Sequence, residues 1–249
     1  MITDTAPAGA PRISAVGQYD RVFYTAIAFA LIAVVLAGFS STYFVPAIFG
    51  REPRTISGAP VTPLVHAHGL LFTAWMTLFV VQAVLIARRQ VRTHRTLGTA
   101  GALLAAAMVV VGAAIAVRTA ARGGAPPGID PRSFLAVPLF DLVLFTAFVT
   151  TALFLRRNKE AHKWLMLLAS VSIVAAAFAR LAGLAVNPFV FFGLAALFIV
   201  AGVVYDGASR GRVHPAYVWG GAVFAISVPL RLALSGTSAW LAVADWLIR

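Results

Sequence analysis

Seven long apolar segments, separated by short basic loops, constrain this chain more than any other feature of its sequence. Hydropathy windows of about 19 residues place these segments at 22–45, 62–87, 97–118, 134–155, 164–186, 188–206 and 216–236. A run of about 20 apolar residues is long enough to cross the hydrocarbon core of a bilayer as a helix. The sequence therefore predicts an all-α polytopic membrane protein, a bundle of seven transmembrane helices.

The composition also indicates that a bilayer is the solvent. Of the 249 residues, 61% are hydrophobic and 11% are charged, whereas soluble domains carry about 25% charged residues. The chain has no cysteine, which excludes disulfides, thiolate metal sites and cysteine nucleophiles, so any metal ligand is His, Asp, Glu or Met. The net charge of +12 lies at the ends of apolar segments, so we expect lipid contacts and no nucleic-acid partner.

Lysine and arginine are divided unevenly between the two sets of loops. The loops on the side of the N-terminus hold 12 of the 20 basic residues, and the other loops hold eight. By the positive-inside rule the N-terminus is cytoplasmic and the C-terminus lies outside, in a bacterial inner membrane. Residues 1–21 are predicted to be a disordered cytoplasmic tail, 22–236 the transmembrane domain, and 237–249 a segment along the outer interface.

Ionisable residues inside apolar segments are costly unless they are paired or belong to a site. A rise of about 1.5 Å per residue gives their depths, and brings one group of them to a single layer near the outer surface. The group comes from the second, fourth, fifth and seventh segments and comprises His66, His68, Asp141, Arg180 and Arg231.

Two interpretations of this outer layer are open. In the first, Asp141 pairs with Arg180 or Arg231, both arginines extend toward the surface, and the histidines make hydrogen bonds between helices. In the second, the layer is a polar pocket for a metal, a proton or a substrate, with the arginines fixing an anion. His66 and His68 are about 200° apart around a helix, so at most one of them faces such a pocket.

A second set of histidines lies at the cytoplasmic side. His94, His162 and His214 stand just before the third, fifth and seventh segments, and Asp206 closes the sixth. A helix N-terminus disfavours an imidazolium, so these rings are able to bind a metal or cap the helix. If the three segments are neighbours, the four residues predict a metal site, or two of the histidines are axial ligands of a b-type haem. The alternative is that each histidine contacts headgroups or loop carbonyls.

Several different short motifs are distributed along nearly the whole chain. They are residues 39–46, His66-Ala67-His68-Gly69 with Trp75 and Gln82, His94-Arg95-Thr96-Leu97-Gly98, Pro138-Leu139-Phe140-Asp141, His162-Lys163-Trp164-Leu165-Met166, and Tyr205-Asp206 through His214-Pro215-Ala216. This pattern resembles a widespread family of bacterial polytopic membrane proteins, a resemblance that implies no activity. Trp164 stands where that pattern has a basic residue. Fainter similarities are to haem-copper oxidase maturation proteins and to cytochrome b561-type bundles.

These observations lead to two main functional hypotheses. The first is a haem- or metal-handling membrane protein, a redox carrier or an accessory factor for respiratory enzymes. Its cofactor would be haem b or an Fe, Cu or Zn ion, and its partner a respiratory complex or a second copy of the chain. The second is a small-molecule transporter or sensor that uses the outer His, Asp and Arg pocket. A purely structural partner protein is a third hypothesis.

Overall fold

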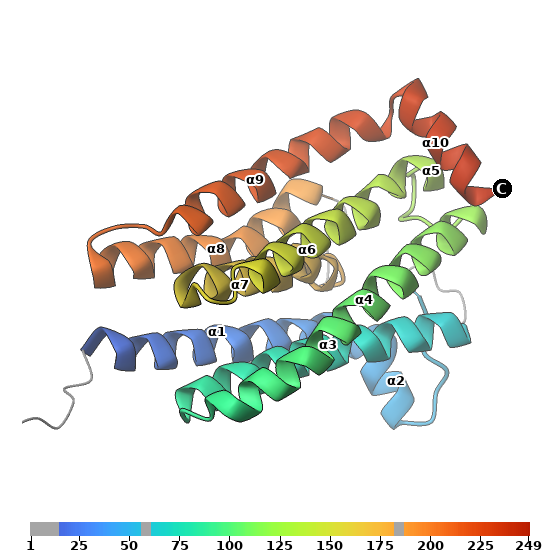
Figure 1. Ribbon diagram of the computed structural model, residues 1–249. Helices are drawn as coiled ribbons and strands as arrows, with labels where there is room; N and C mark the ends of the chain where they lie inside the picture. The colour runs from blue at the N-terminus through green and yellow to red at the C-terminus, as the bar shows by residue number, and fades with distance from the viewer. Residues whose placement is uncertain (1–14, 56–60, 182–186) are drawn as a thin grey trace, which may run out of the picture.

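The computed structural model describes residues 15–55, 61–181 and 187–249, which form helices and no strand (Figure 1). Seven of these helices are long and apolar enough to cross a membrane, the first being α1 continued through η1 and α2. The predicted all-α bundle of seven spanning helices is therefore confirmed. The elements are α1 (Ala15–Phe39), η1 (Ser40–Phe44), α2 (Val45–Ile48), α3 (Pro63–Ala87), α4 (Val91–Ala121), α5 (Pro131–Phe134), α6 (Ala136–Phe154), α7 (Lys159–Phe178), α8 (Pro188–Arg210), α9 (Pro215–Ser235) and α10 (Ser238–Ile248).

The bundle has two ends, and which of them faces the cytoplasm remains a prediction. We call one the proximal end, on the left of Figure 1, where α1, α4, α7 and α9 begin and α3, α6 and α8 finish. We call the other the distal end. It carries α2, α5 and α10.

Side-chain caps determine where several of the spanning helices begin. A cap side chain accepts a hydrogen bond from a backbone N–H that the first turn would otherwise leave unsatisfied. Proline at the first position adds a pre-set backbone angle. These caps are Thr62 for α3, Asn158 for α7, Asn187 for α8 and His214 for α9, and Pro63, Pro188 and Pro215 follow three of them.

Helix bounds differ from the hydropathy prediction at the proximal end. α1 begins at Ala15, inside the predicted tail, of which residues 1–14 lie outside the described part. α4 and α7 begin five or six residues earlier than predicted, because a polar first turn at a membrane surface lowers the mean hydropathy. His94 and His162 therefore lie within a first helical turn and do not precede it. The end of the predicted fifth segment, residues 182–186, lies outside the described part.

α7 is the central helix of the bundle. Within the protein, 78% of its most apolar window is buried, against 17–39% for the other six spanning helices. It packs against α1, α6, α8 and α9. Small residues make this approach close, since a methyl group on Gly38 of α1 would overlap the Ala177 carbonyl of α7.

The distal end contains two local departures from a straight bundle. The π-helical turn η1 interrupts the first span, and from it the Tyr43 hydroxyl lies 2.8 Å from His66 Nδ1 on α3. The C-terminal segment forms the separate short helix α10, which packs on α4, α5 and α9 (Figure 1). Trp240 Nε1 donates to the Arg132 carbonyl at 2.9 Å and thereby ties α10 to α5.

Candidate functional site

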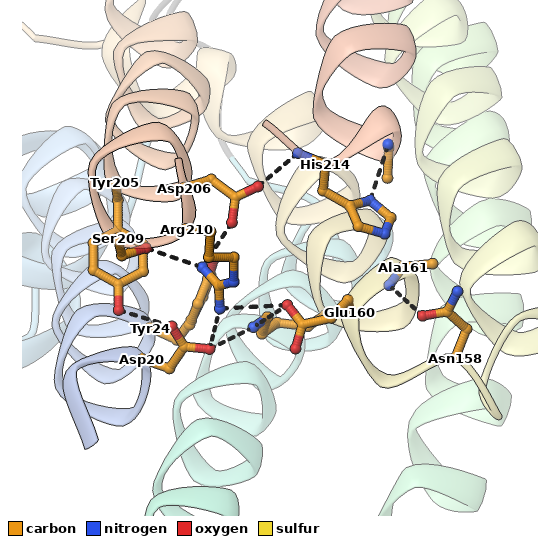
Figure 2. Close-up of polar contacts among 12 residues, drawn as sticks. Asp20, Tyr24, Asn158, Glu160, Ala161, Tyr205, Asp206, Ser209, Arg210 and His214 are labelled. Atoms are coloured by element: carbon orange, nitrogen blue, oxygen red, sulfur yellow. Dashed lines mark hydrogen bonds and ion pairs between the residues drawn. The ribbon is translucent and has the colours of Figure 1, made fainter. Parts of the chain in front are cut away.

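The proximal end holds two groups of polar side chains on different helices. One group joins α1, α7 and α8, and we call it the ion network (Figure 2). The other joins α4 and α7, and we call it the histidine pair. The ion network comprises Asp20, Glu160, Lys163, Asp206 and Arg210, and the histidine pair comprises His94 and His162.

Asp20 is the centre of the ion network. Its carboxylate accepts hydrogen bonds from Lys163 Nζ at 2.8 Å, from Tyr205 Oη at 2.7 Å and from the Arg210 guanidinium. Lys163 also contacts Glu160 at 2.8 Å (Figure 2). Because these residues come from three helices far apart in the chain, the network joins the proximal ends of α1, α7 and α8.

Asp206 and His214 together set the start of α9. The fully buried Asp206 carboxylate accepts from Arg210 Nη1 at 2.7 Å and from the His214 backbone N–H at 2.6 Å. The His214 ring nitrogen Nδ1 in turn accepts from the Ala216 N–H at 3.1 Å and caps the helix (Figure 2). Both residues thus have structural partners, which matches the capping alternative for His214.

An aromatic layer lies directly beneath the ion network. The Trp164 ring is fully buried between Tyr24 and Tyr217, with ring centroids 4.7 and 4.5 Å away. Lys163 Nζ lies 4.1 Å from the Trp164 centroid, so the electron-rich ring face stabilises a partly desolvated ammonium. Trp164 Nε1 is buried and has no hydrogen-bond partner within the described residues.

The histidine pair brings together two rings from different helices. The ring centroids of His94 and His162 are 6.4 Å apart and their planes are at 88°. His162 Nδ1 lies 2.8 Å from the Ala152 carbonyl oxygen of α6. A carbonyl oxygen only accepts, so Nδ1 carries the proton and Nε2 of the neutral ring keeps its lone pair.

His94 stands next to a second polar side chain with free hydrogen-bonding capacity. Gln82 Nε2 on α3 donates to the His94 backbone carbonyl at 3.2 Å. In the described part of the chain, His94 Nδ1 and Gln82 Oε1 are buried and have no hydrogen-bond partner. Buried polar atoms are seldom left unpaired, so these two distinguish the pair from the saturated ion network.

The metal site predicted from four residues is not assembled. Over residues 15–55, 61–181 and 187–249, no three His, Asp or Glu side chains are grouped so that they could hold a metal ion. The physical reason is helix adjacency, because α4 packs mainly on α3 and α6 whereas α9 packs mainly on α6, α7 and α8. Only His94 and His162 meet, and His214 and Asp206 belong to the α9 cap.

The predicted outer layer lies toward the distal end of the bundle. There Asp141 pairs with Arg231, one of its two predicted partners. Arg231 is completely buried and so does not extend toward the surface as one interpretation expected. Its guanidinium bonds Asp141 through Nη1, the Ser227 carbonyl through Nε at 3.1 Å and the Ser227 hydroxyl through Nη2 at 2.8 Å. It also lies 4.4 Å from the Phe192 ring centroid, so the pair is enclosed and well satisfied.

The other three residues of the predicted outer layer do not join this pair. Arg180 donates to the Ala176 carbonyl at 2.7 Å and stacks over Phe39. His66 is exposed and contacts Tyr43, whereas the half-buried His68 lies against Phe72. The two histidines face different surroundings, as their spacing predicted. No hydrogen bond or ion pair within the described residues connects these three to Asp141 or Arg231.

Most members of the ion network, and Gln82, are not predicted as site residues by the sequence; Asp20 and Gln82 are the clearest cases. Asp20 was assigned to the tail, although it is an acid at the membrane face where several basic residues gather. Gln82 lies in a motif but is not assigned to a site from the sequence, and it contacts the first turn of α4. Gln82 is a polar residue in an apolar segment, at about the same depth as His94, and such a residue needs a polar partner on a neighbouring helix. That feature predicts a contact between the two segments.

Comparison with known proteins adds no identification. No family model, curated protein or solved structure matches this chain. The family resemblance of the motifs therefore remains a prediction.

Proposed function

We propose that this chain is a haem- or metal-handling membrane protein in which His94 and His162 ligate one metal centre at the proximal end. The observation that carries the proposal is the convergence of these two imidazoles from α4 and α7. The metal centre would be either an ion or the iron of a haem, because imidazole serves both.

The separation of the rings fits a shared metal. Imidazole nitrogens bind at about 2.0–2.1 Å from such a metal, which places the two ring centres roughly 4.5–6.5 Å apart depending on the angle between the ligands. The observed 6.4 Å lies near the upper end of this interval. His94 and His162 would be the residues that hold the metal or the haem iron.

The protonation of the pair also suits ligation. The Ala152 carbonyl holds the proton on His162 Nδ1 and leaves Nε2 as the donor atom, the usual second contact of a metal-bound histidine. His94 lies in the first turn of α4, where the helix dipole disfavours a charged ring. A bound group would also explain why His94 Nδ1 and Gln82 Oε1 are buried without partners in the described chain.

The protein's own contribution is to hold and orient the ligands at a membrane face. Packing of α4 and α7 on α6 positions the two rings, and Gln82 ties the start of α4 to α3. A bound haem, Fe or Cu would supply electron transfer, whereas Zn would only be carried. The position near the surface would let a respiratory partner exchange electrons or metal with the site. This supports a redox carrier or an accessory factor.

The distal transporter or sensor has less support. Its predicted binding site comprised Asp141, Arg180 and Arg231, with a histidine to carry the proton. Asp141 and Arg231 bond each other within a closed environment, and Arg180 bonds the Ala176 carbonyl instead. An anion would have to displace Asp141 from Arg231, and the released carboxylate would then be unpaired in an apolar region.

Optical spectra and elemental analysis of the purified protein test the proposal. We expect one haem, seen as a Soret band, or one Fe, Cu or Zn ion per chain without that band. His94→Gln and His162→Gln should each lose the bound group. His66→Gln, which changes an exposed distal histidine, should retain it. Absence of haem and of stoichiometric metal, also after incubation with hemin and with each ion, would refute the proposal.

A further inference from the structure

Two of the turns at the proximal end carry several basic side chains that have no acidic partner in the described chain. One turn joins α3 to α4 and the other joins α6 to α7. The acids of this end, Asp20, Glu160 and Asp206, are engaged by Lys163 and Arg210. The basic residues in and next to these two turns are all exposed, and none is in an ion pair of the described chain. We call them the basic rim: Arg88, Arg89, Arg92, Arg95, Arg156, Arg157 and Lys159.

A shallow hollow of about 480 Å³ lies at one of these turns. It is lined by Thr150, Leu153 and Phe154 at the end of α6 and by Arg156 and Arg157 in the turn. The Phe154 side chain is 82% exposed, which in a spanning helix places an aromatic ring toward the bilayer. The hollow thus combines an apolar wall beside the membrane with two free guanidinium groups at its edge.

We propose that this hollow binds an anionic phospholipid, with the phosphate against Arg156 and Arg157 and an acyl chain along Leu153 and Phe154. Guanidinium groups present paired N–H donors that match phosphate oxygens. Clusters of basic residues directly beside a membrane-spanning helix attract anionic lipids. A soluble phosphate would use the arginines only, whereas a lipid also uses the apolar wall.

The charge arrangement favours a lipid over an acidic protein segment. The guanidinium groups follow the last turn of α6 after only Leu155, so their donors lie at headgroup depth if the apolar part of α6 spans the hydrocarbon core. Long basic side chains at a helix end extend to that depth. This site is separate from the histidine pair, and its occupancy does not depend on a metal.

Lipid binding can be measured on detergent-purified, delipidated protein. Native mass spectrometry and thermal unfolding would be recorded with phosphatidylglycerol, phosphatidylcholine or glycerol phosphate. We expect phosphatidylglycerol to bind and to raise the melting temperature, and the other two to have little effect. Arg156→Gln with Arg157→Gln should weaken phosphatidylglycerol binding roughly tenfold.

A matched control removes the same charge elsewhere. Arg118→Gln with Arg122→Gln changes two exposed arginines at the distal end of α4 and should leave binding unaltered. Phe154→Ala should weaken phosphatidylglycerol binding without changing the charge. Equal binding of phosphatidylcholine, equal binding of glycerol phosphate, or equal losses in the two double variants would each overturn the lipid site. A helical circular dichroism spectrum for every variant shows that the fold is retained.

Discussion

Arg231 and His94 are both polar residues of a largely apolar bundle, yet their surroundings differ in a way that separates structure from function. Arg231 is fully buried and bonds both Asp141 and Ser227. In the described chain, His94 Nδ1 has no partner, and the neighbouring Gln82 Oε1 has none either. A saturated group stabilises the fold by staying where it is, whereas an unsaturated group has capacity left for a ligand.

The largest effect on stability should come from breaking the ion pair between Asp141 and Arg231. Asp141→Ala leaves Arg231 buried without a counter-charge, at a cost of about 3–5 kcal/mol in the free energy of unfolding. Unfolding in detergent, followed by circular dichroism, measures it. The double variant Asp141→Ala with Arg231→Leu should be milder, because no unpaired charge remains. An unchanged stability of Asp141→Ala would mean that the carboxylate faces water and that Arg231 does not need it as a buried partner.

A smaller effect is expected from the hydroxyl that supports Arg231. Ser227→Ala removes the acceptor 2.8 Å from Arg231 Nη2, and losing a hydrogen bond to a charged group costs about 1.5–3 kcal/mol. The same unfolding measurement applies. Ser235→Ala is the control, because that hydroxyl bonds only the Leu232 carbonyl within its own helix. Equal effects of the two substitutions would show that Ser227 does not act through Arg231.

The ion network should contribute less, because it lies at the surface. Asp20→Asn weakens contacts to Lys163 and Arg210, but these side chains are partly solvated and screened, so we expect a loss of about 1 kcal/mol that shrinks as salt is raised. Asp245→Asn tests a more exposed ion pair, with Arg132, and should cost less. Salt-independent losses in Asp20→Asn would point to packing and not to charge.

The smallest effect on stability should come from the histidine pair. In metal-free protein, His94→Gln removes a ring nitrogen that has no partner in the described chain, so the free energy of unfolding should change by less than about 0.5 kcal/mol. Stability and cofactor content would be measured on the same preparation. A large loss of stability in metal-free protein would assign His94 a structural role like that of Arg231.

Hydropathy and depth were sufficient for the fold and for one contact. Seven apolar runs predict seven helices because a bilayer admits few other ways to satisfy the backbone. Asp141 could be assigned a cationic partner because an unpaired carboxylate at that depth is strongly unfavourable and only two arginines lie near it in height. These inferences need only distances along a helix axis, which the sequence supplies.

The remaining site could not be predicted because it depends on which helices are neighbours. His94, His162 and His214 occupy equivalent positions in the sequence, but only α4 and α7 bring their rings together. Asp206 and His214 serve as partners of a helix start, a role that follows from the conformation of the α8–α9 turn. Asp20 was missed because the first turns of α1 are too polar for a hydropathy window to include them.

The enclosure of α7 limits how this protein can move. A helix that is surrounded on most sides, and that touches the backbone of α1 at Gly38, can neither rotate nor slide without separating its neighbours. α7 therefore stays in place, and any displacement must occur in the helices around it. Rocking of two half-bundles about a central cleft would require α7 to separate from one of them. Sequence drift should follow the same division, with lipid-facing positions of the outer helices varying freely and the small residues of α7 held constant.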